Sequence, residues 1–277
     1  MSDIHPAVAP STVLEVRDYT KRYGATLAVD RLSFAVEAGQ VVGLVGPNGA
    51  GKTTTMRAIA GIIPPSEGSL RVGGHDVVAD PVAAKRLLAY VPDDPKLFDT
   101  LTVEEHLQFT ASIYDVPSWK DRARPLMERF ELDAKRNALA RELSRGMRQK
   151  VAICCAYLHQ PRLVMFDEPM TGLDPLGIRT LRESIREQAR QGMGILISSH
   201  LLALVEDLTT HLLILDRGVR RFAGSLAEAR ASYAHEGASL EEVFFRATGA
   251  ATATPAPPVP HGSADERGPS AEGGLGR

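Results

Sequence analysis

Residues 44–55 of the chain read LVGPNGAGKTTT. The glycines and the lysine fit the pattern G-x-x-x-x-G-K-[ST], in which a glycine-rich loop wraps the phosphates of a nucleotide. The loop follows an apolar run, QVVGLVG, and leads into a helical pattern, TTTMRAIAGI. A strand that passes through such a loop into a helix turns backbone N–H groups and the helix N-terminus towards an anion. This stretch therefore predicts a nucleotide site.

The side chains of this loop predict how the phosphates are held. Lys52 is placed for the β- and γ-phosphates, which makes it a candidate catalytic residue, and the Thr53 hydroxyl is placed for Mg²⁺. The glycines let the backbone turn tightly and approach phosphate. The nucleotide-binding residues predicted from this stretch are Gly46, Pro47, Asn48, Gly49, Ala50, Gly51, Lys52, Thr53 and Thr54.

A second stretch, RLVMFDEP at residues 162–169, supplies paired carboxylates. The apolar residues before Asp167 predict a buried strand that ends at the carboxyl edge of a sheet, where Asp167 can hold Mg²⁺. Glu168 is placed to polarise a water that attacks the γ-phosphate, which is the role of a general base. Without the phosphate loop, the same residues would indicate only a strand that ends in solvated acids.

Short apolar runs alternate with helical patterns along the chain, which predicts an α/β fold with a parallel sheet. Ligands of such sheets bind beyond the carboxyl ends of the strands. Two earlier stretches alternate as antiparallel or edge strands do, and residues 101–143 read as mostly helical. The parallel strands are expected in QVVGLVG, LLAYVP, RLVMFDE, GILISSH and HLLILD, and the antiparallel ones in STVLEVRDYTKRYG and LAVDRLSFAVEAG.

Composition limits the classes of partner. A net charge of −2 gives no basic footprint for nucleic acid. The longest apolar run, VAICCAYL, is far too short to span a bilayer, so work at a membrane would require a partner. The two adjacent cysteines fit a reducing cytoplasm. Residues 1–11 are expected to form a flexible leader, and residues 250–277, rich in Ala, Pro and Gly, a disordered tail.

The stretch ELSRGMRQK, residues 142–150, separates the classes of phosphate-loop protein. Ser144 predicts a helix N-cap, and Gly146 in the first turn permits a close approach, so a second anion-binding helix end is expected. A GTPase is disfavoured because the only asparagines are Asn48 and Asn137, and neither belongs to an N-K-x-D element. A small-molecule kinase remains possible, but it would not explain this second helix end.

In combination, these residues resemble the ATP-binding cassette (ABC) family over about residues 13–249. The resemblance implies the RecA-like parallel sheet core of P-loop NTPases, with an antiparallel β subdomain and a helical signature subdomain at about residues 101–158, all within a domain of residues 12–249. It implies that LSRGM is the signature motif, whose Ser144 and Gly146 contact ATP held by the opposite subunit.

The resemblance also assigns roles to three isolated residues. Tyr23, in KRYG, occupies the position at which the family stacks an aromatic ring on adenine. Asp174, in TGLD, matches the cross-subunit contact of the family's D-loop. His200, in LISSH, matches the switch histidine that reaches a γ-phosphate and is a candidate catalytic residue. The implied cofactors are ATP and Mg²⁺.

The chain departs from the family pattern at two places. Asp93 stands where the family usually has glutamine; its carboxylate can bind Mg²⁺ or orient water, but it adds negative charge near the phosphates. In the signature, usually LSGGQ, Arg145 replaces the first glycine and Met147 replaces the glutamine. Two directions are open for Arg145, towards phosphate or away from it.

The resemblance implies the ATP-hydrolysing subunit of an ABC transporter, working as an ATP-sandwich dimer for which a homodimer suffices. Its expected partner is a polytopic membrane permease, gripped by the helical insertion and residues 93–107, with Leu97 and Phe98 as candidate contacts or core residues. The subunit would then lie on the cytoplasmic face of the cell membrane. The stretches LTVEEHLQFTASIYDV and SLEEVFFRATG resemble those of exporter-type ATPases that pair with a separately encoded membrane subunit, and this resemblance favours export over import. The alternative is a soluble ABC ATPase in cofactor assembly or another non-transport role.

Overall fold

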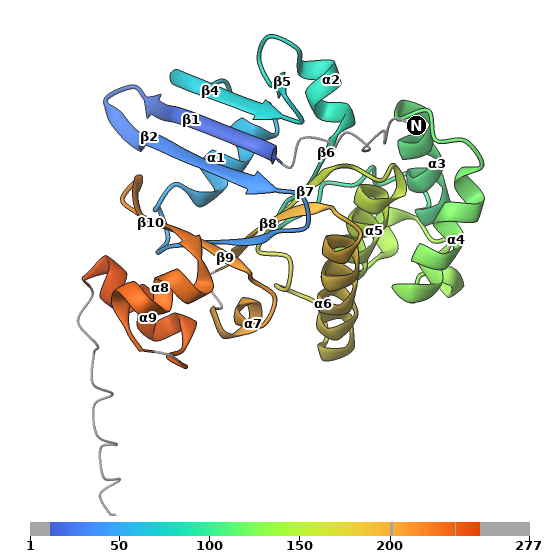
Figure 1. Cartoon of the computed structure of the whole chain (residues 1–277). Helices are drawn as coiled ribbons and strands as arrows, with labels where there is room; N and C mark the ends of the chain where they lie inside the picture. Colours follow the sequence, from blue (N-terminus) through green and yellow to red (C-terminus); the bar gives the residue numbers. More distant parts are fainter. Residues whose placement is uncertain (1–11, 200–201, 236, 250–277) are drawn as a thin grey trace, which may run out of the picture.

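Two β-sheets form the framework of the chain in the computed structural model, which describes residues 12–199, 202–235 and 237–249 (Figure 1). The larger sheet has the strand order β10-β9-β3-β8-β7-β6. All neighbours in it are parallel except β10, which pairs antiparallel with β9. Its strands are β3 (Val41–Val45), β6 (Leu88–Val91), β7 (Leu163–Asp167), β8 (Gly194–Ser199), β9 (His211–Asp216) and β10 (Val219–Ser225).

The central strands of this sheet are buried on both faces. Every residue of β3, β7 and β8 is buried. Because successive side chains of a strand point to opposite faces, Val164 and Phe166 join one core while Leu163 and Met165 join the other. This double burial explains why these strands are continuous apolar runs, and it confirms the predicted parallel sheet.

The smaller sheet is antiparallel, with the order β2-β1-β4-β5. It packs with α1 and α2 over one face of the larger sheet and encloses the second core. The sequence predicted β1 and β2, but β4 and β5 carry no comparable pattern and were missed. Its strands are β1 (Thr12–Tyr23), β2 (Thr26–Glu37), β4 (Glu67–Val72) and β5 (His75–Asp76).

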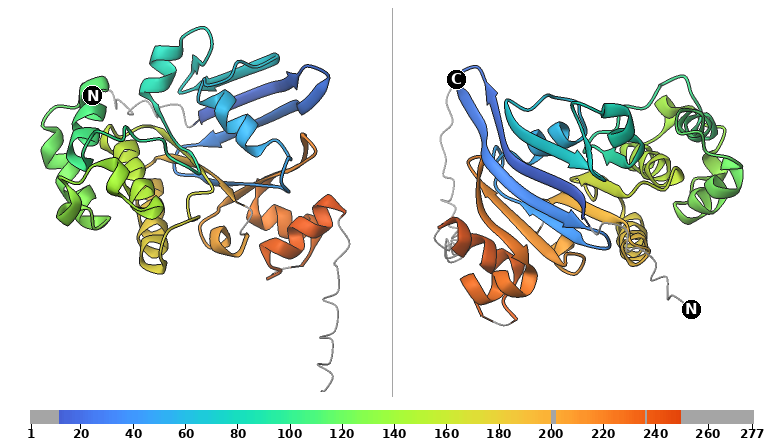
Figure 2. Two further views of the ribbon diagram at one scale, coloured as in Figure 1. Left: turned by 180° about the vertical axis from the view of Figure 1, so that it is seen from behind. Right: turned by 45° about the horizontal axis from the view of Figure 1, so that its top comes forward.

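Most of the helices cover the other face of the larger sheet, and α3, α4 and α5 lie at the end of the molecule away from the antiparallel sheet (Figures 1 and 2). Thr102 begins α3 with a capping box, in which its side chain accepts from the Glu105 N–H and the Glu105 carboxylate accepts from the Thr102 N–H. The helices are α1 (Lys52–Ile59), α2 (Pro81–Arg86), α3 (Val103–Ile113), α4 (Trp119–Arg129), η1 (Asp133–Lys135), η2 (Ala140–Glu142), α5 (Arg145–Leu158), α6 (Pro175–Arg190), α7 (Leu202–Glu206), α8 (Leu226–Tyr233) and α9 (Leu240–Thr248).

The order of the parallel strands brings distant motifs to one edge. β8 lies between β3 and β7, so the loop after Val45 and the carboxylates that end β7 share the carboxyl edge of the sheet. The predicted leader and tail lie outside the described residues, as does His200. Within the described ranges, no helix is long and apolar enough to cross a membrane.

Candidate functional site

The phosphate loop joins β3 to α1 and is packed too closely for side chains at two of its glycines. A Cβ on Gly46 would lie 2.4 Å from the Leu215 carbonyl oxygen on the neighbouring strand β9. Gly51, at the N-cap of α1, has a φ of 100°, and a Cβ there would lie 2.9 Å from the Ala28 carbonyl oxygen. Only glycine fits both positions, because each requires the absence of a Cβ and Gly51 also requires a left-handed backbone.

The Lys52 side chain is folded back onto this loop. Its ammonium donates to the carbonyl oxygens of Gly46 (2.7 Å) and Pro47 (3.2 Å). Burial lowers the pKa of Lys52 from its ordinary value, whereas the charges of Glu168 and Asp167 oppose that shift. The loop backbone thus supplies two acceptors for the Lys52 amine.

Asp167 is fixed by the two strands that flank it. The Ser198 hydroxyl on β8 donates to Asp167 Oδ1 at 2.5 Å, and the Tyr90 hydroxyl on β6 donates to Oδ2 at 3.2 Å. Burial, reinforced by the charge of Asp167, raises the pKa of Tyr90, so its hydroxyl stays protonated as a donor at neutral pH. These two partners, which the sequence did not identify, hold a carboxylate that is only 3% exposed.

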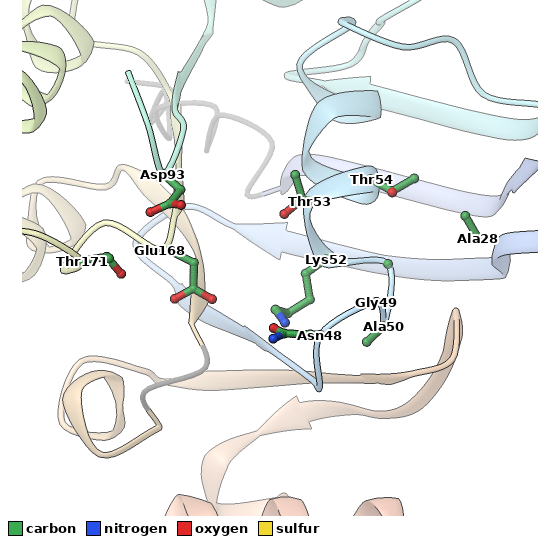
Figure 3. Close-up of a pocket in the computed structure, with 11 residues that line it drawn as sticks. Ala28, Asn48, Gly49, Ala50, Lys52, Thr53, Thr54, Asp93, Glu168 and Thr171 are labelled. Carbon is green, nitrogen blue, oxygen red and sulfur yellow. The ribbon is translucent and has the colours of Figure 1, made fainter. Parts of the chain in front are cut away.

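Glu168 leaves the strand direction immediately after Asp167. Its φ is 51°, a left-handed conformation that non-glycine residues adopt rarely and that is often found at functional sites. Its N–H donates to the Ser198 carbonyl oxygen at 3.1 Å, which anchors the turn to β8. Figure 3 shows Glu168 and Lys52 on opposite sides of the pocket.

The loop and the carboxylate edge enclose a cavity of about 360 Å³. Most of the predicted loop residues line it, together with Glu168 and Asp93 (Figure 3). Ala28 and Thr171 line it too; Thr171 belongs to the TGLD stretch, but neither residue was predicted to bind the nucleotide. The lining residues are Ala28, Asn48, Gly49, Ala50, Gly51, Lys52, Thr53, Thr54, Asp93, Glu168 and Thr171.

Tyr23 does not line this cavity, although it shortly precedes a lining residue, Ala28, in the chain. It is the last residue of β1, and it pairs with Thr26 across the turn into β2, the strand that contributes Ala28 to the lining. The ring is 50% exposed, and the Lys21 ammonium lies 5.0 Å from its centroid. The exposed ring on this hairpin is available to stack on a base. Its contact with adenine remains a prediction.

The LSRGM stretch begins helix α5, as the sequence predicted. The Ser144 side chain accepts from the Met147 N–H at 3.2 Å and caps the helix. A Cβ on Gly146 would lie 2.6 Å from the Gly172 carbonyl oxygen, so the absence of a side chain lets this helix end pack against the backbone of Gly172 and Leu173. Neither Ser144 nor Gly146 lines the cavity of its own chain.

Asp174 has a structural role within the chain. Its Oδ1 accepts from the Gly177 N–H at 2.8 Å and caps α6, and the Lys150 ammonium lies 3.9 Å from the same oxygen. The carboxylate is nevertheless 60% exposed. Its predicted contact with a second subunit remains a prediction.

The donor set fits a magnesium ion that is bound together with phosphate. Mg²⁺ typically takes one or two protein oxygens, several waters and phosphate oxygens, not a dedicated cage of side chains. Thr53 lines the cavity, and Asp167 directly precedes Glu168, which lines it as well. Among the described residues, no group of three or more His, Cys, Asp or Glu side chains forms a cage.

Comparison with known proteins identifies the family of the chain. The family profile described as "ABC transporter" matches residues 29–171. The ABC-type transporter ATP-binding protein EcsA of Bacillus subtilis is 36% identical over 239 residues, which cover 86% of this chain and 97% of that protein. The bacitracin transport ATP-binding protein BcrA of Bacillus licheniformis is 35% identical, covering 85% and 71%.

A solved structure entitled "Structure of ATP binding subunit of ABC transporter" superposes with a TM-score of 0.82 at 38% identity, covering 85% of this chain and 99% of that one. The predicted P-loop fold, with its antiparallel and helical parts, is therefore confirmed. The chain belongs to the ATP-binding subunits of the ABC transporter family.

Proposed function

We propose that this chain hydrolyses ATP in the cavity between the phosphate loop and Glu168, as a pair of identical subunits that power export through a membrane partner. The observation that carries the proposal is the position of the LSRGM helix end outside the cavity of its own chain. Each chain has one phosphate loop and one capped LSRGM helix end, but that helix end is absent from the lining of the chain's own cavity. A symmetric pair can complete both cavities with residues of one sequence.

Within each cavity, the residues of the chain have separate tasks. Lys52 would exchange its loop carbonyl partners for phosphate oxygens, and Glu168 would accept the proton of the attacking water. Magnesium, when bound, would neutralise phosphate charge, held by Thr53 and by Asp167. His200 is proposed as a γ-phosphate contact from the family resemblance alone, because it lies outside the described residues.

A surface formed by the segment before α3 and by α3 itself suits the membrane partner. Phe98 is 55% and Phe109 45% exposed, and their rings meet edge to face with centroids 5.3 Å apart. His106 orders this surface because its Nε2 accepts from the Phe98 N–H at 3.0 Å while its Nδ1 donates to the Thr102 carbonyl oxygen at 2.7 Å. Leu97 packs against the core and anchors the segment. Exposed aromatic pairs of this kind are typical anchors for a partner.

The relatives support the direction and place of this work. They include a Nod factor export ATP-binding protein of Ralstonia nicotianae at 35% identity and a linearmycin resistance ATP-binding protein of Bacillus subtilis at 33%. We therefore propose export of a cargo from the cytoplasm, with the chain held at the inner face of the membrane by its partner. Transporter subunits among the relatives favour this role over soluble cofactor assembly.

The substitution Glu168→Gln tests the chemistry. We expect ATP hydrolysis to fall at least about 100-fold because the general base is lost, while ATP binding is kept because Lys52 and the loop are intact. Steady-state phosphate release and equilibrium binding measure the two properties. Glu183→Gln, which changes an exposed glutamate on α6, is the matched control and should leave both unchanged. Hydrolysis that survives in Glu168→Gln would remove Glu168 from the proposed role.

A further inference from the structure

The two departures from the family pattern contact each other. Arg145 Nη2 lies 2.7 Å from Asp93 Oδ1 and 3.4 Å from the Asp93 carbonyl oxygen. Both side chains are 49% exposed, so the pair is half open to solvent and not in the core. The first residue of α5 is thereby joined to the segment that follows β6, 52 positions earlier in the chain.

The stem of Arg145 is held by packing. A Cβ on Gly172 would lie only 3.2 Å from Arg145 Cδ, so the methylene groups lie against the glycine backbone. Gly172 also has a φ of 82°, which disfavours any larger residue there. This packing and the Ser144 cap together orient the Arg145 guanidinium towards Asp93 of the same chain.

Asp93 lies where its charge affects the nucleotide. Its carboxylate lines the same cavity as Lys52, Thr53 and Glu168 (Figure 3). A negative charge within several ångströms of phosphates repels them, and more strongly for a triphosphate than for a diphosphate. An amide would be neutral at this position. A carboxylate that is paired with a guanidinium carries no net charge either.

The neighbouring charges do not replace Arg145. Asp94, the next residue, has a pKa held below its ordinary value first by its hydrogen bond with Lys96, so that lysine is already committed to Asp94. Arg148 donates to the Leu143 carbonyl oxygen at 3.3 Å. Arg145 is therefore the cation that the geometry assigns to Asp93.

We infer that Arg145 neutralises and positions Asp93 within its own chain, and thereby sets the preference of the cavity for ATP over ADP, instead of binding the ATP of the partner subunit. The inference rests on the proposed ATP site and adds a positioning residue to it. It answers the question that the sequence left open, because Arg145 is directed towards the carboxylate that replaces the glutamine.

A double-mutant cycle on the full chain tests this pairing. The variants are Arg145→Gly, Asp93→Gln and the two combined, and the measurement is equilibrium binding of ATP and of ADP in EDTA, where no hydrolysis occurs. We expect Arg145→Gly to weaken ATP binding about three- to tenfold, since an uncompensated carboxylate then faces the phosphates across partly screened distances. ADP binding should change less than ATP binding. The double variant should bind ATP as the unaltered chain does.

The double variant separates the two possible roles of Arg145. If the guanidinium bound the partner's ATP, removing Asp93 as well would not restore affinity, and the inference would be overturned. Equal weakening of ATP and ADP binding by Arg145→Gly would also overturn it, because that result indicates a general structural loss. Arg141→Gly, which removes an exposed arginine on η2, controls for the loss of one positive charge.

The same titration distinguishes this inference from the proposed function. Binding of ATP by the unaltered chain reports on the nucleotide site itself. If the site binds ATP and the four chains bind it equally, only the role of Arg145 fails. If the unaltered chain binds neither nucleotide, the proposed function and the inference fail together. Thermal unfolding should change little in any variant, because exposed ion pairs contribute little to stability.

Discussion

The phosphate loop and the LSRGM helix end are both helix N-termini suited to an anion, but they differ in what surrounds them. The loop faces a cavity that its own chain lines with a lysine, a threonine and a glutamate. The LSRGM end is equally well formed, with a serine cap and a close glycine contact, yet it lies outside that cavity. The role of the loop follows from a single chain, whereas the LSRGM end has a role at an ATP site only under the proposed pairing of two chains.

The phosphate loop and the LSRGM helix end also differ in how closely their sequences keep the family pattern. The loop and the carboxylates keep the common family pattern, whereas Arg145 and Met147 depart from it in the signature, and Asp93 departs from it in the segment that contacts the signature. The chemistry of phosphate leaves little freedom for the lysine, threonine and glutamate. The contact between Arg145 and Asp93 brings two of these departures together as side chains of opposite charge.

Among the changes at the ATP site that test this comparison, Ser198→Ala on β8 is expected to have the largest effect on magnesium-dependent hydrolysis. The change removes the donor to Asp167 Oδ1 and leaves a buried carboxylate oxygen without that partner, which costs about 1–3 kcal/mol of stability. Groups that orient a metal-binding side chain typically contribute about 10- to 100-fold in metal affinity or activity. We therefore expect the magnesium concentration for half-maximal hydrolysis to rise by that order.

Ser112→Ala is the control for this change, because it removes an exposed hydroxyl on α3 that donates to the Gln108 carbonyl oxygen. Magnesium titrations of ATP hydrolysis compare the two variants. An unchanged magnesium requirement in Ser198→Ala would mean that Tyr90 alone holds Asp167, and it would remove Ser198 from the site.

A smaller effect on the isolated protein is expected from Phe98→Ala, on the helical side of the molecule. Because Phe98 is exposed and does not line the ATP cavity, ATP hydrolysis by the isolated chain should remain nearly unchanged. Recovery of the tagged chain with a polytopic protein from mildly solubilised membranes should fall sharply, as truncation of an aromatic anchor typically costs about 2 kcal/mol or more of binding.

Ile62→Ala is matched to Phe98→Ala, since Ile62 is also apolar and 59% exposed but follows α1 on the other side of the chain. It should leave the membrane partner bound. Equal recovery of both variants with the partner would show that the Phe98 surface is not where the permease docks.

Local patterns in the sequence predicted much of the fold and the loop half of the site. The loop, the buried strands and the pair Asp167 and Glu168 depend on short-range spacing and on alternation of apolar residues. The partners of Asp167 could not be found in this way, because Tyr90 and Ser198 reach it only through the order β6-β7-β8. Strand order depends on contacts between residues far apart in the chain, which a local pattern does not encode.

The direction of Arg145 was unpredictable for a similar reason. Its target lies 52 positions away, and the packing on Gly172 that aims it belongs to a third segment. The antiparallel edge strand β10 and the strands β4 and β5 were missed because they are short or largely exposed. The roles of Tyr23, Asp174 and His200 came from the family resemblance and remain predictions.

The composite cavity is tested most directly by mixing two inactive chains, one carrying Lys52→Ala and the other Ser144→Arg. If each cavity combines one chain's loop with the partner's signature, a mixed pair contains one cavity with both defects and one that is intact. Random pairing makes half of the pairs mixed, so ATP hydrolysis should return to about a quarter of the unaltered rate, as expected for two equivalent sites in a symmetric dimer. If the mixture stays as inactive as each variant alone, while both variants remain folded, the two-chain cavity is contradicted.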